Sequence, residues 1–186
     1  VEGYDVRAAS REEVESLGAK FVSAGIQAEG QGGYARELTP EERGAQQEAL
    51  AQRIRQADVV ICTASIPGRP APKIVLKPMV EAMKPGSVIV DLAAESGGNC
   101  ELTQAGREVK HGGAMILGPL NLAATLAEDA SRLYAQNIYN LLSLIVHDGE
   151  VRLDWSDEVV SKTALTHDGQ ITHEATRRLL EGDSKK

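Results

Sequence analysis

Aromatic residues are scarce in this sequence: phenylalanine, tryptophan and tyrosine make up 3% of its 186 residues. The hydrophobic fraction is nevertheless 42%, so a buried core must be built from alanine, valine, isoleucine and leucine. Buried strands of an α/β sheet read as aliphatic runs of this kind. The composition therefore favours an α/β fold, in a chain long enough for one domain and a piece of another.

Other absences each exclude a class of protein. The only two cysteines, Cys62 and Cys100, lack C-x-x-C or histidine spacing, so neither a metal site nor a disulfide framework is indicated. The net charge of -7, without clusters of lysine and arginine, argues against nucleic-acid binding. No apolar run approaches the roughly 20 residues of a membrane span, and no signal-peptide pattern opens the chain. We expect a soluble chain in a reducing compartment.

The first part of the chain predicts two helices separated by a long loop. Ser10-Arg11-Glu12-Glu13 has the spacing of a capping box, and Gly18 is placed to end the short helix that follows. A strand is expected at about 19–22 and a glycine-rich loop at 23–38. Thr39 as N-cap, with proline and acidic residues next, begins a second helix that reaches about residue 56.

Aliphatic runs alternate with helices in the middle of the chain. Buried strands are predicted at 58–63 and 87–92, with a proline-rich loop at 67–72 and a helix at about 78–83 between them. Together with a first strand at 1–7, this alternation is typical of a doubly wound parallel sheet.

The pattern changes near residue 121. Apolar residues recur at helical spacing over 128–146, which predicts the longest helix. We therefore expect two regions, with 1–125 in an α/β domain and 126–186 as a connecting helix and a C-terminal segment that returns to another lobe. Antiparallel strands are expected in that segment at 151–155, at 159–165 and near residue 171.

Asp5 closes the first strand, and ligands of a parallel sheet gather at the carboxyl ends of its strands. In dinucleotide-binding units a carboxylate at this place binds the ribose hydroxyls, about 20 residues after a glycine-rich loop. No such loop precedes Asp5, so we expect the chain to begin inside a nucleotide site. A carboxylate here favours NAD over NADP, while Arg7 either accommodates a 2′-phosphate or is a surface charge. An acidic residue also ends many strands without binding anything.

Two further loops leave predicted strand ends. Thr63, Ala64 and Ser65 are small enough to let a flat ring or a pyrophosphate approach, but they equally suit a tight turn. The segment 93–100, with paired glycines, suits either a ligand or an ordinary connection. No histidine has an acid or nucleophile at diagnostic spacing, and no nucleophile elbow, Walker loop or H-E-x-x-H motif is present. Hydride transfer between two nicotinamides needs none of these groups.

Four stretches occur in the order and spacing of one family: Tyr4-Asp5-Val6-Arg7-Ala8-Ala9, Gly32-Gly33-Tyr34-Ala35, the run from Thr63 to Pro72 and the run from Asp91 to Cys100. From Val1 to about His173 the chain closely resembles the NAD(H)-binding domain I of the alpha subunit of proton-translocating nicotinamide nucleotide transhydrogenase, in the family that also contains alanine dehydrogenase. The resemblance implies a Rossmann-like sheet that lacks its first β-α unit. A long helix and antiparallel strands of a second lobe would follow it.

The resemblance also implies a set of cofactor-binding residues. Asp5, Val6 and Arg7 would surround the adenosine ribose, and Ser65 would line the nicotinamide end, although such families commonly have leucine there. Gly33 and Tyr34 would lie on a mobile lid that closes over the nucleotide. The whole implied set is Asp5, Val6, Arg7, Gly33, Tyr34, Gln46, Thr63, Ala64 and Ser65.

In that family domain I binds NADH and passes hydride directly to NADP⁺ on domain III, coupled to proton movement through membrane domain II. The resemblance implies a homodimer of domain I at the cytoplasmic face of the inner (plasma) membrane, with no metal and no nucleic acid. The pyrophosphate loop and an Arg-Gln-Asp loop that orients the nicotinamide would precede Val1, so we expect this chain alone to bind NAD poorly and to be inactive. The alternatives are an alanine dehydrogenase-like oxidoreductase and a non-catalytic NAD-binding assembly module.

Overall fold

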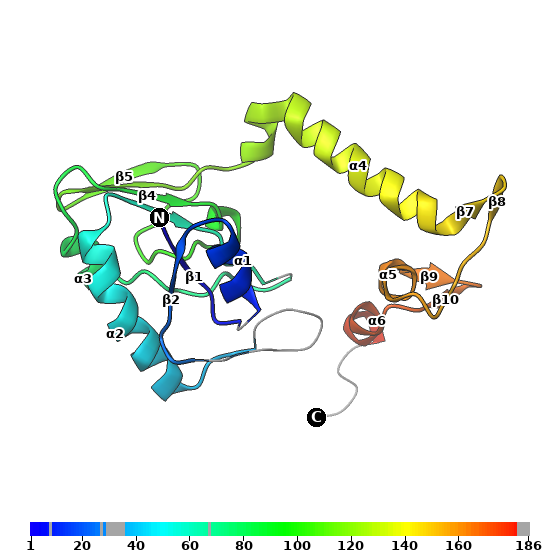
Figure 1. The fold of residues 1–186 in the computed structure, drawn as a ribbon, viewed down its shortest axis with the longest axis horizontal. Coiled ribbons are helices and arrows are strands. Elements are labelled where there is room, and N and C mark those ends of the chain that lie inside the picture. Colours follow the sequence, from blue (N-terminus) through cyan, green and yellow to red (C-terminus); the bar gives the residue numbers. More distant parts are fainter. Residues whose placement is uncertain (8, 27, 29–35, 67, 182–186) are drawn as a thin grey trace. The chain divides into compact units, whose positions relative to one another are not determined.

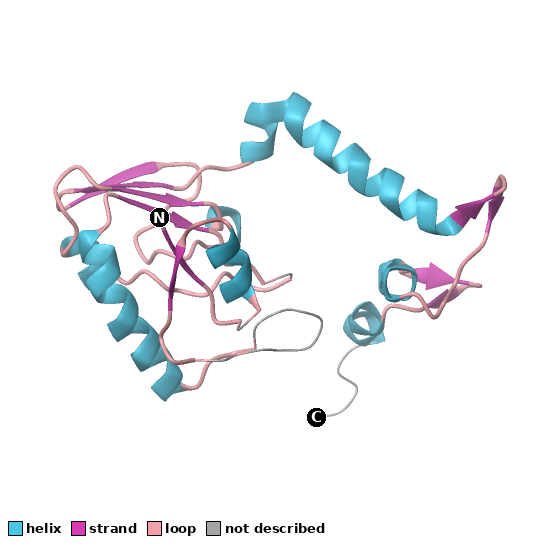
Figure 2. Cartoon of the chain, viewed as in Figure 1, coloured by secondary structure: helices cyan, strands magenta, loops and turns pink. Residues whose placement is uncertain are grey.

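The computed structural model describes residues 1–7, 9–26, 28, 36–66 and 68–181. The chain divides into two compact units, Val1–Leu122 and Ala123–Lys186. Figure 1 shows that the first unit combines strands with helices, and Figure 2 shows that the second is mostly helical with short hairpins.

Two sheets form the first unit, and most of their strands run parallel. In the smaller sheet, β1 (Glu2–Tyr4) pairs in parallel with β2 (Lys20–Val22). The larger sheet has the order β3-β4-β6-β5, in which β3, β4 and β6 are parallel and β5 is antiparallel to β6. Its strands are β3 (Val59–Cys62), β4 (Val88–Asp91), β5 (Glu108–His111) and β6 (Ala114–Leu117). This is a mixed, Rossmann-like α/β arrangement.

The hairpin of β5 and β6 corrects the expectation of a purely parallel sheet. No strand was predicted at 108–117, yet β6 is the parallel neighbour of β4 and β5 closes the sheet edge. The reversal occurs at Gly112, whose φ is 59°, and Gly113. A Cβ on Gly113 would lie 2.7 Å from the Cα of Pro85, so only glycine lets the hairpin pack against that turn.

The helices of the first unit include the predicted long one. α2 (Pro40–Gln56) begins at Thr39, whose hydroxyl accepts from the Glu42 amide while the Glu42 carboxylate accepts from the Thr39 amide. The capping box predicted at Ser10 is wrong, because Ser10 already lies inside α1 (Ser10–Ser16) and the N-cap is Ala9 without a side-chain bond. The remaining helical elements are α3 (Lys77–Glu81) and the short η2 (Ala94–Ser96).

The core of the first unit is aliphatic, as the shortage of aromatic residues required. α2 contributes Leu50 and Ile54, and the larger sheet contributes Ile89 and Ile116, which are fully buried. Tyr4 is an aromatic side chain that packs against this cluster. The cluster consists of Val22, Leu50, Ile54, Cys62, Val75, Met79, Val80, Met83, Ile89, Cys100, Ala114 and Ile116.

The second unit contains the predicted long helix, α4 (Ala127–Ile145), which begins after a short turn of η3 (Leu122–Leu126). None of its side chains is buried. Two hairpins turn at Asp148-Gly149 and Asp168-Gly169, all at positive φ, which confirms antiparallel pairing at these turns. Their strands are β7 (Val146–His147), β8 (Glu150–Val151), β9 (Thr166–His167) and β10 (Gln170–Ile171).

The strand predicted at 159–165 is wrong, because this segment begins with helix α5 (Glu158–Thr163). Asp157 caps it by accepting hydrogen bonds from the amides of Val159 and Val160, which overrides the strand preference of the two valines. The strand expected at 151–155 is reduced to the end of β8. α6 (Glu174–Glu181) ends the described chain, and no helix in the described residues is long and apolar enough to cross a membrane.

Candidate functional site

Asp5 and Arg7 form an ion pair directly after β1. The Asp5 carboxylate accepts from the Arg7 amide at 2.9 Å and from the Arg7 guanidinium at 3.1 Å through Nε and 2.8 Å through an η nitrogen. The side chains are 28% and 41% exposed, respectively. The pair is therefore anchored to the strand end by a backbone bond and remains accessible from solvent.

Asp5 stays ionised in this setting. Partial burial raises the pKa of its carboxyl, but hydrogen bonds from Arg7 and from the Ser10 hydroxyl outweigh that effect and hold the pKa below its usual value. Ser10 therefore supports Asp5 instead of capping its own helix. The carboxylate in turn raises the pKa of Arg7, so the two charges persist together near neutral pH. The arrangement presents a fixed, partly satisfied anion at the end of a parallel strand.

Gln46 projects from the middle of α2 toward β1. Its Nε2 donates to the hydroxyl of Tyr4 at 3.0 Å, and the residue is 7% exposed. Burial raises the pKa of Tyr4, so the phenol keeps its proton. The structure thus joins Gln46 to the residue that precedes Asp5, and part of its hydrogen-bonding capacity is used inside the protein.

The loop after β3 places its three small residues differently. Thr63 and Ser65 are exposed, whereas Ala64 is half-buried between them. Both backbone polar groups of Ala64 bind the side chain of Asn99, at 3.0 Å from its amide and 2.8 Å from its carbonyl. Because β3 and β4 pair in parallel, this loop and the segment after β4 leave the same edge of the larger sheet.

The segment after β4 is organised by two buried polar residues that sequence reasoning did not select. Asp91, fully buried, accepts from the amides of Ala93 and Cys100 and from the hydroxyl of Thr103 at 2.6 Å. Asn99 is also fully buried. Their signal in the sequence is an Asp and an Asn that flank a glycine pair immediately after an aliphatic strand.

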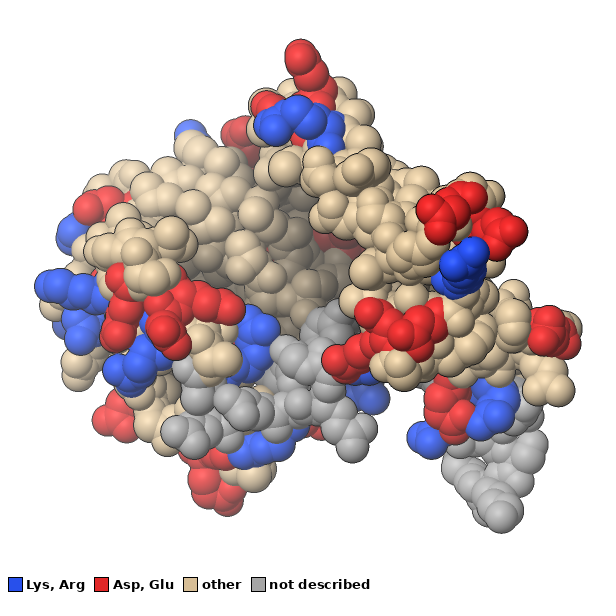
Figure 3. All heavy atoms as spheres, turned by 45° about the vertical axis from the view of Figure 1, so that its right-hand side comes forward, with Lys and Arg blue, Asp and Glu red and all other residues tan. Residues whose placement is uncertain are grey.

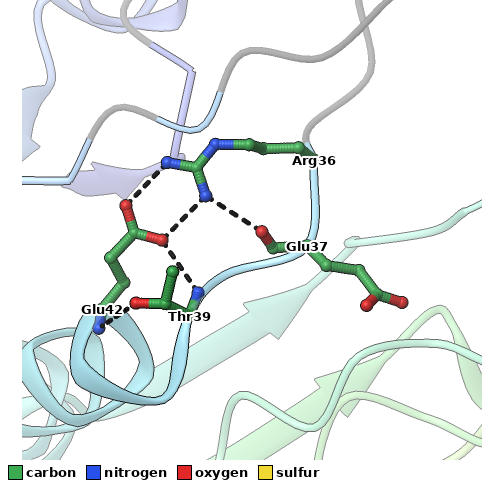
Figure 4. Close-up of polar contacts among 4 residues, drawn as sticks. All are labelled: Arg36, Glu37, Thr39 and Glu42. Atoms are coloured by element: carbon green, nitrogen blue, oxygen red, sulfur yellow. Dashed lines mark hydrogen bonds and ion pairs between the residues drawn. The ribbon is translucent and has the colours of Figure 1, made fainter.

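The end of the long loop is fixed to the first turn of α2. Arg36 donates to both carboxylate oxygens of Glu42, at 2.8 and 2.7 Å, and to the carbonyl of Glu37 at 2.9 Å (Figure 4). These bonds and that of the Thr39 amide lower the pKa of Glu42 to about 2. The segment therefore meets α2 at a defined place. Gly33 and Tyr34, predicted on the lid within this loop, lie outside the described residues.

Charges and thiols indicate no other chemistry in the described part of the chain. In Figure 3 acidic and basic side chains lie next to one another on the visible surface. No group of three or more metal-ligating side chains occurs among the described residues. Cys62 and Cys100 are buried free thiols, and burial, with smaller effects of Asp91 and Cys100, raises the pKa of Cys62 to about 12. Cys62 is therefore uncharged at neutral pH and a poor nucleophile.

Comparison with known proteins places the chain among nucleotide-dependent oxidoreductases. The family model "Alanine dehydrogenase/PNT, C-terminal domain" matches residues 1–174. The chain is 44% identical over 183 residues to an NAD(P) transhydrogenase subunit alpha protein of Rickettsia prowazekii, covering 97% of this chain and 47% of that protein. The structure of transhydrogenase from Sinorhizobium meliloti matches with a TM-score of 0.68 and 44% identity, covering 92% of this chain and 45% of the other.

A more distant relative is alanine dehydrogenase 1 of Staphylococcus aureus, which is 30% identical over 131 residues. This match covers 68% of the chain and 35% of that protein. The chain spans about half the length, or less, of the curated relatives it matches.

Proposed function

We propose a function from one premise: the chain belongs to the alanine dehydrogenase/PNT family, through its C-terminal domain. Within this family the chain is proposed to be the NAD(H)-binding component of a nicotinamide nucleotide transhydrogenase. Its identity of 44% with a transhydrogenase alpha subunit over nearly the whole chain, against 30% with an alanine dehydrogenase over a shorter stretch, supports this choice.

The observation that carries the proposal is the Asp5 carboxylate. It is ionised, partly exposed and fixed at the end of a parallel strand, where a dinucleotide-binding unit binds the adenosine ribose. Its negative charge would repel the 2′-phosphate of NADP. Arg7, the nearby cation that could offset this repulsion, has its guanidinium bound to Asp5. The pair therefore supports NAD(H) over NADP(H) as the ligand.

We propose Val6, Gln46, Thr63, Ala64 and Ser65 as further contacts to NAD(H). The small, exposed residues after β3 suit a nicotinamide ring, and their edge is shared with the end of β4. At Gln46 the contact would come from the portion of the amide that Tyr4 does not use. Gly33 and Tyr34 remain proposed contacts on a lid.

The site is proposed to be completed by one further β-α unit, and β3 supplies the reason. In the described sheets β1 pairs only with β2, and β3 pairs only with β4, so each has an edge that could accept a strand. Val59 and Ile61, two residues apart on one face of β3, are 58% and 64% exposed. A strand would satisfy the edges, and a helix behind it would bury that face. A glycine-rich turn between the two would hold the pyrophosphate.

The complete reaction is proposed to be direct hydride transfer from NADH to NADP⁺ on a partner domain, coupled to proton translocation through a membrane domain. In this proposal domain I is a homodimer at the cytoplasmic face of the inner membrane. The described residues need to supply only binding and orientation, since hydride passes between two cofactors without a protein nucleophile.

Calorimetric titration with NADH tests the proposal. The complete subunit should bind NADH, and the 186-residue chain alone should bind it much more weakly because a portion of the pyrophosphate site is supplied elsewhere. Mixing the complete subunit with an NADP(H)-binding partner domain should give hydride exchange between the two nucleotides. Alanine-dependent reduction of NAD⁺ instead would favour an alanine dehydrogenase, and NADH binding without either reaction would favour a non-catalytic module. Micromolar affinity of the isolated chain would contradict the proposed division of the site.

A further inference from the structure

Asn99 connects the two loops that leave the shared edge of β3 and β4. Its Oδ1 accepts from the Ala64 amide at 3.0 Å, and its Nδ2 donates to the Ala64 carbonyl at 2.8 Å and to the Pro72 carbonyl at 2.9 Å. One carboxamide thus binds both polar groups of a single residue, as a neighbouring strand would. The side chain is fully buried and both of its N–H donors are used.

The position of Asn99 is itself fixed from both sides. The amide of the next residue, Cys100, donates to Asp91 at the end of β4 at 2.9 Å. The Asn99 carbonyl accepts from the amides of Ile74 and Val75, at 2.8 and 3.1 Å. Its carboxamide therefore cannot turn away without breaking several buried hydrogen bonds, and it transmits the position of the β4 end to Ala64.

We propose that Asn99 is a positioning residue, which sets the backbone at Ala64 and thereby the surface that Thr63 and Ser65 present to a ligand. This inference rests on the proposed function, in which that surface borders the nicotinamide ring. Because Asn99 takes the Ala64 amide, Ala64 offers the ring a small apolar surface and no N–H donor. The hydroxyls of Thr63 and Ser65, both exposed, are the groups left for polar contact.

Aspartate could not replace Asn99. A carboxylate can still accept from the Ala64 amide, but it cannot donate to the carbonyls of Ala64 and Pro72. Two carbonyl oxygens would then face a carboxylate oxygen in a buried site, and the loop would move to relieve the repulsion. A displacement of about 1 Å at a reacting centre can cost on the order of 100-fold in rate.

The test uses the complete subunit mixed with its NADP(H)-binding partner, and compares Asn99→Asp with wild type. The hydride-transfer rate at saturating NADH should fall about 10- to 100-fold. The dissociation constant for NADH should change less than about threefold, since Asp5 on a different strand is untouched. Asn99→Ser, which leaves space for a water molecule, repeats the test if Asn99→Asp fails to fold.

Ile116→Val is the matched control, because Ile116 is fully buried in β6 and is not among the bonded partners of the Ala64 loop. It should lower thermal stability while leaving the rate at saturating NADH unchanged. Amide hydrogen exchange supplies a second readout, in which Ala64 should be protected in wild type and should exchange faster in both Asn99 variants.

Each other outcome has a definite meaning. A rate equal to wild type, or a loss no larger than that of Ile116→Val, would show that Asn99 only stabilises the fold. A loss confined to NADH affinity would also overturn the positioning role. A wild-type subunit that neither binds NADH nor exchanges hydride would overturn the proposed function, with the Asn99 inference falling alongside it.

Discussion

Gly98 lies against Asp91, so closely that a Cβ on Gly98 would stand 2.7 Å from the Asp91 Oδ2 and 2.8 Å from the Thr103 side chain. The same Oδ2 accepts the bonds that hold Cys100 and Thr103. The glycine pair after β4 therefore serves, at its second position, to let the chain fold onto a buried carboxylate. A structural requirement accounts for Gly98 without any ligand.

Gly98→Ala should destabilise the chain more than Gly97→Ala. Both glycines have positive φ, at 79° and 100°, so alanine is strained at either position by about 1–2 kcal/mol. Only Gly98 lacks space for a methyl group, since nothing lies within 4 Å of a Cβ at Gly97. Overpacking should add about 1–3 kcal/mol to the loss at Gly98. Denaturant unfolding measures the difference, and equal losses would show that Asp91 and Thr103 move aside freely.

The pairing of Glu42 predicts a pH-dependent contribution to stability. Its pKa is lowered from 4.5 to about 2, so the group is ionised more readily in the folded chain than in the unfolded one. Its contribution is therefore fully present above pH 4.5 and is lost as the pH falls toward 2. The melting temperature of Glu42→Gln should lie below that of wild type at pH 6, and the gap should close under acid. Glu41→Gln, an exposed acid on the same turn, is the control.

The sequence predicted the elements that carry strong local signals. Thr39 and Pro40 marked the start of α2 correctly, and the aliphatic runs of β3 and β4 were found because buried parallel strands have little polar alternation. The Asp-Gly turns were likewise correct, because few residue pairs tolerate positive φ. These signals depend on neighbouring residues only.

Features that depend on tertiary context were missed or misread. Ser10 has the spacing of a capping box, but its hydroxyl is used by Asp5. Val159 and Val160 favour a strand, yet the cap at Asp157 directs them into a helix. Asn99 went unnoticed, because a carboxamide that joins loops 35 residues apart leaves no local pattern.

Ile61→Ser should distinguish the isolated chain from the complete subunit. Ile61 is 64% exposed in the described sheet, so the change should alter the stability of the 186-residue chain by less than about 0.5 kcal/mol. If a further β-α unit covers β3, the same change should cost the complete subunit about 1.5–3 kcal/mol. Ile89→Val, already fully buried in β4, should cost about 0.5–1.5 kcal/mol in both. Equal, small effects of Ile61→Ser in both proteins would argue against a covering unit.

Asp5→Asn tests whether the strand-end carboxylate binds the nucleotide. Loss of a charged hydrogen-bond acceptor should weaken NADH binding to the complete subunit by about 1–3 kcal/mol, or roughly 5- to 150-fold in the dissociation constant. Glu2→Gln is a close control, because Glu2 is also a carboxylate of β1 with an arginine partner, Arg53 at 3.2 Å, but it begins the strand that Asp5 follows. Titration should find Glu2→Gln unchanged. If both variants bind NADH as wild type does, Asp5 merely ends its strand and fixes Arg7.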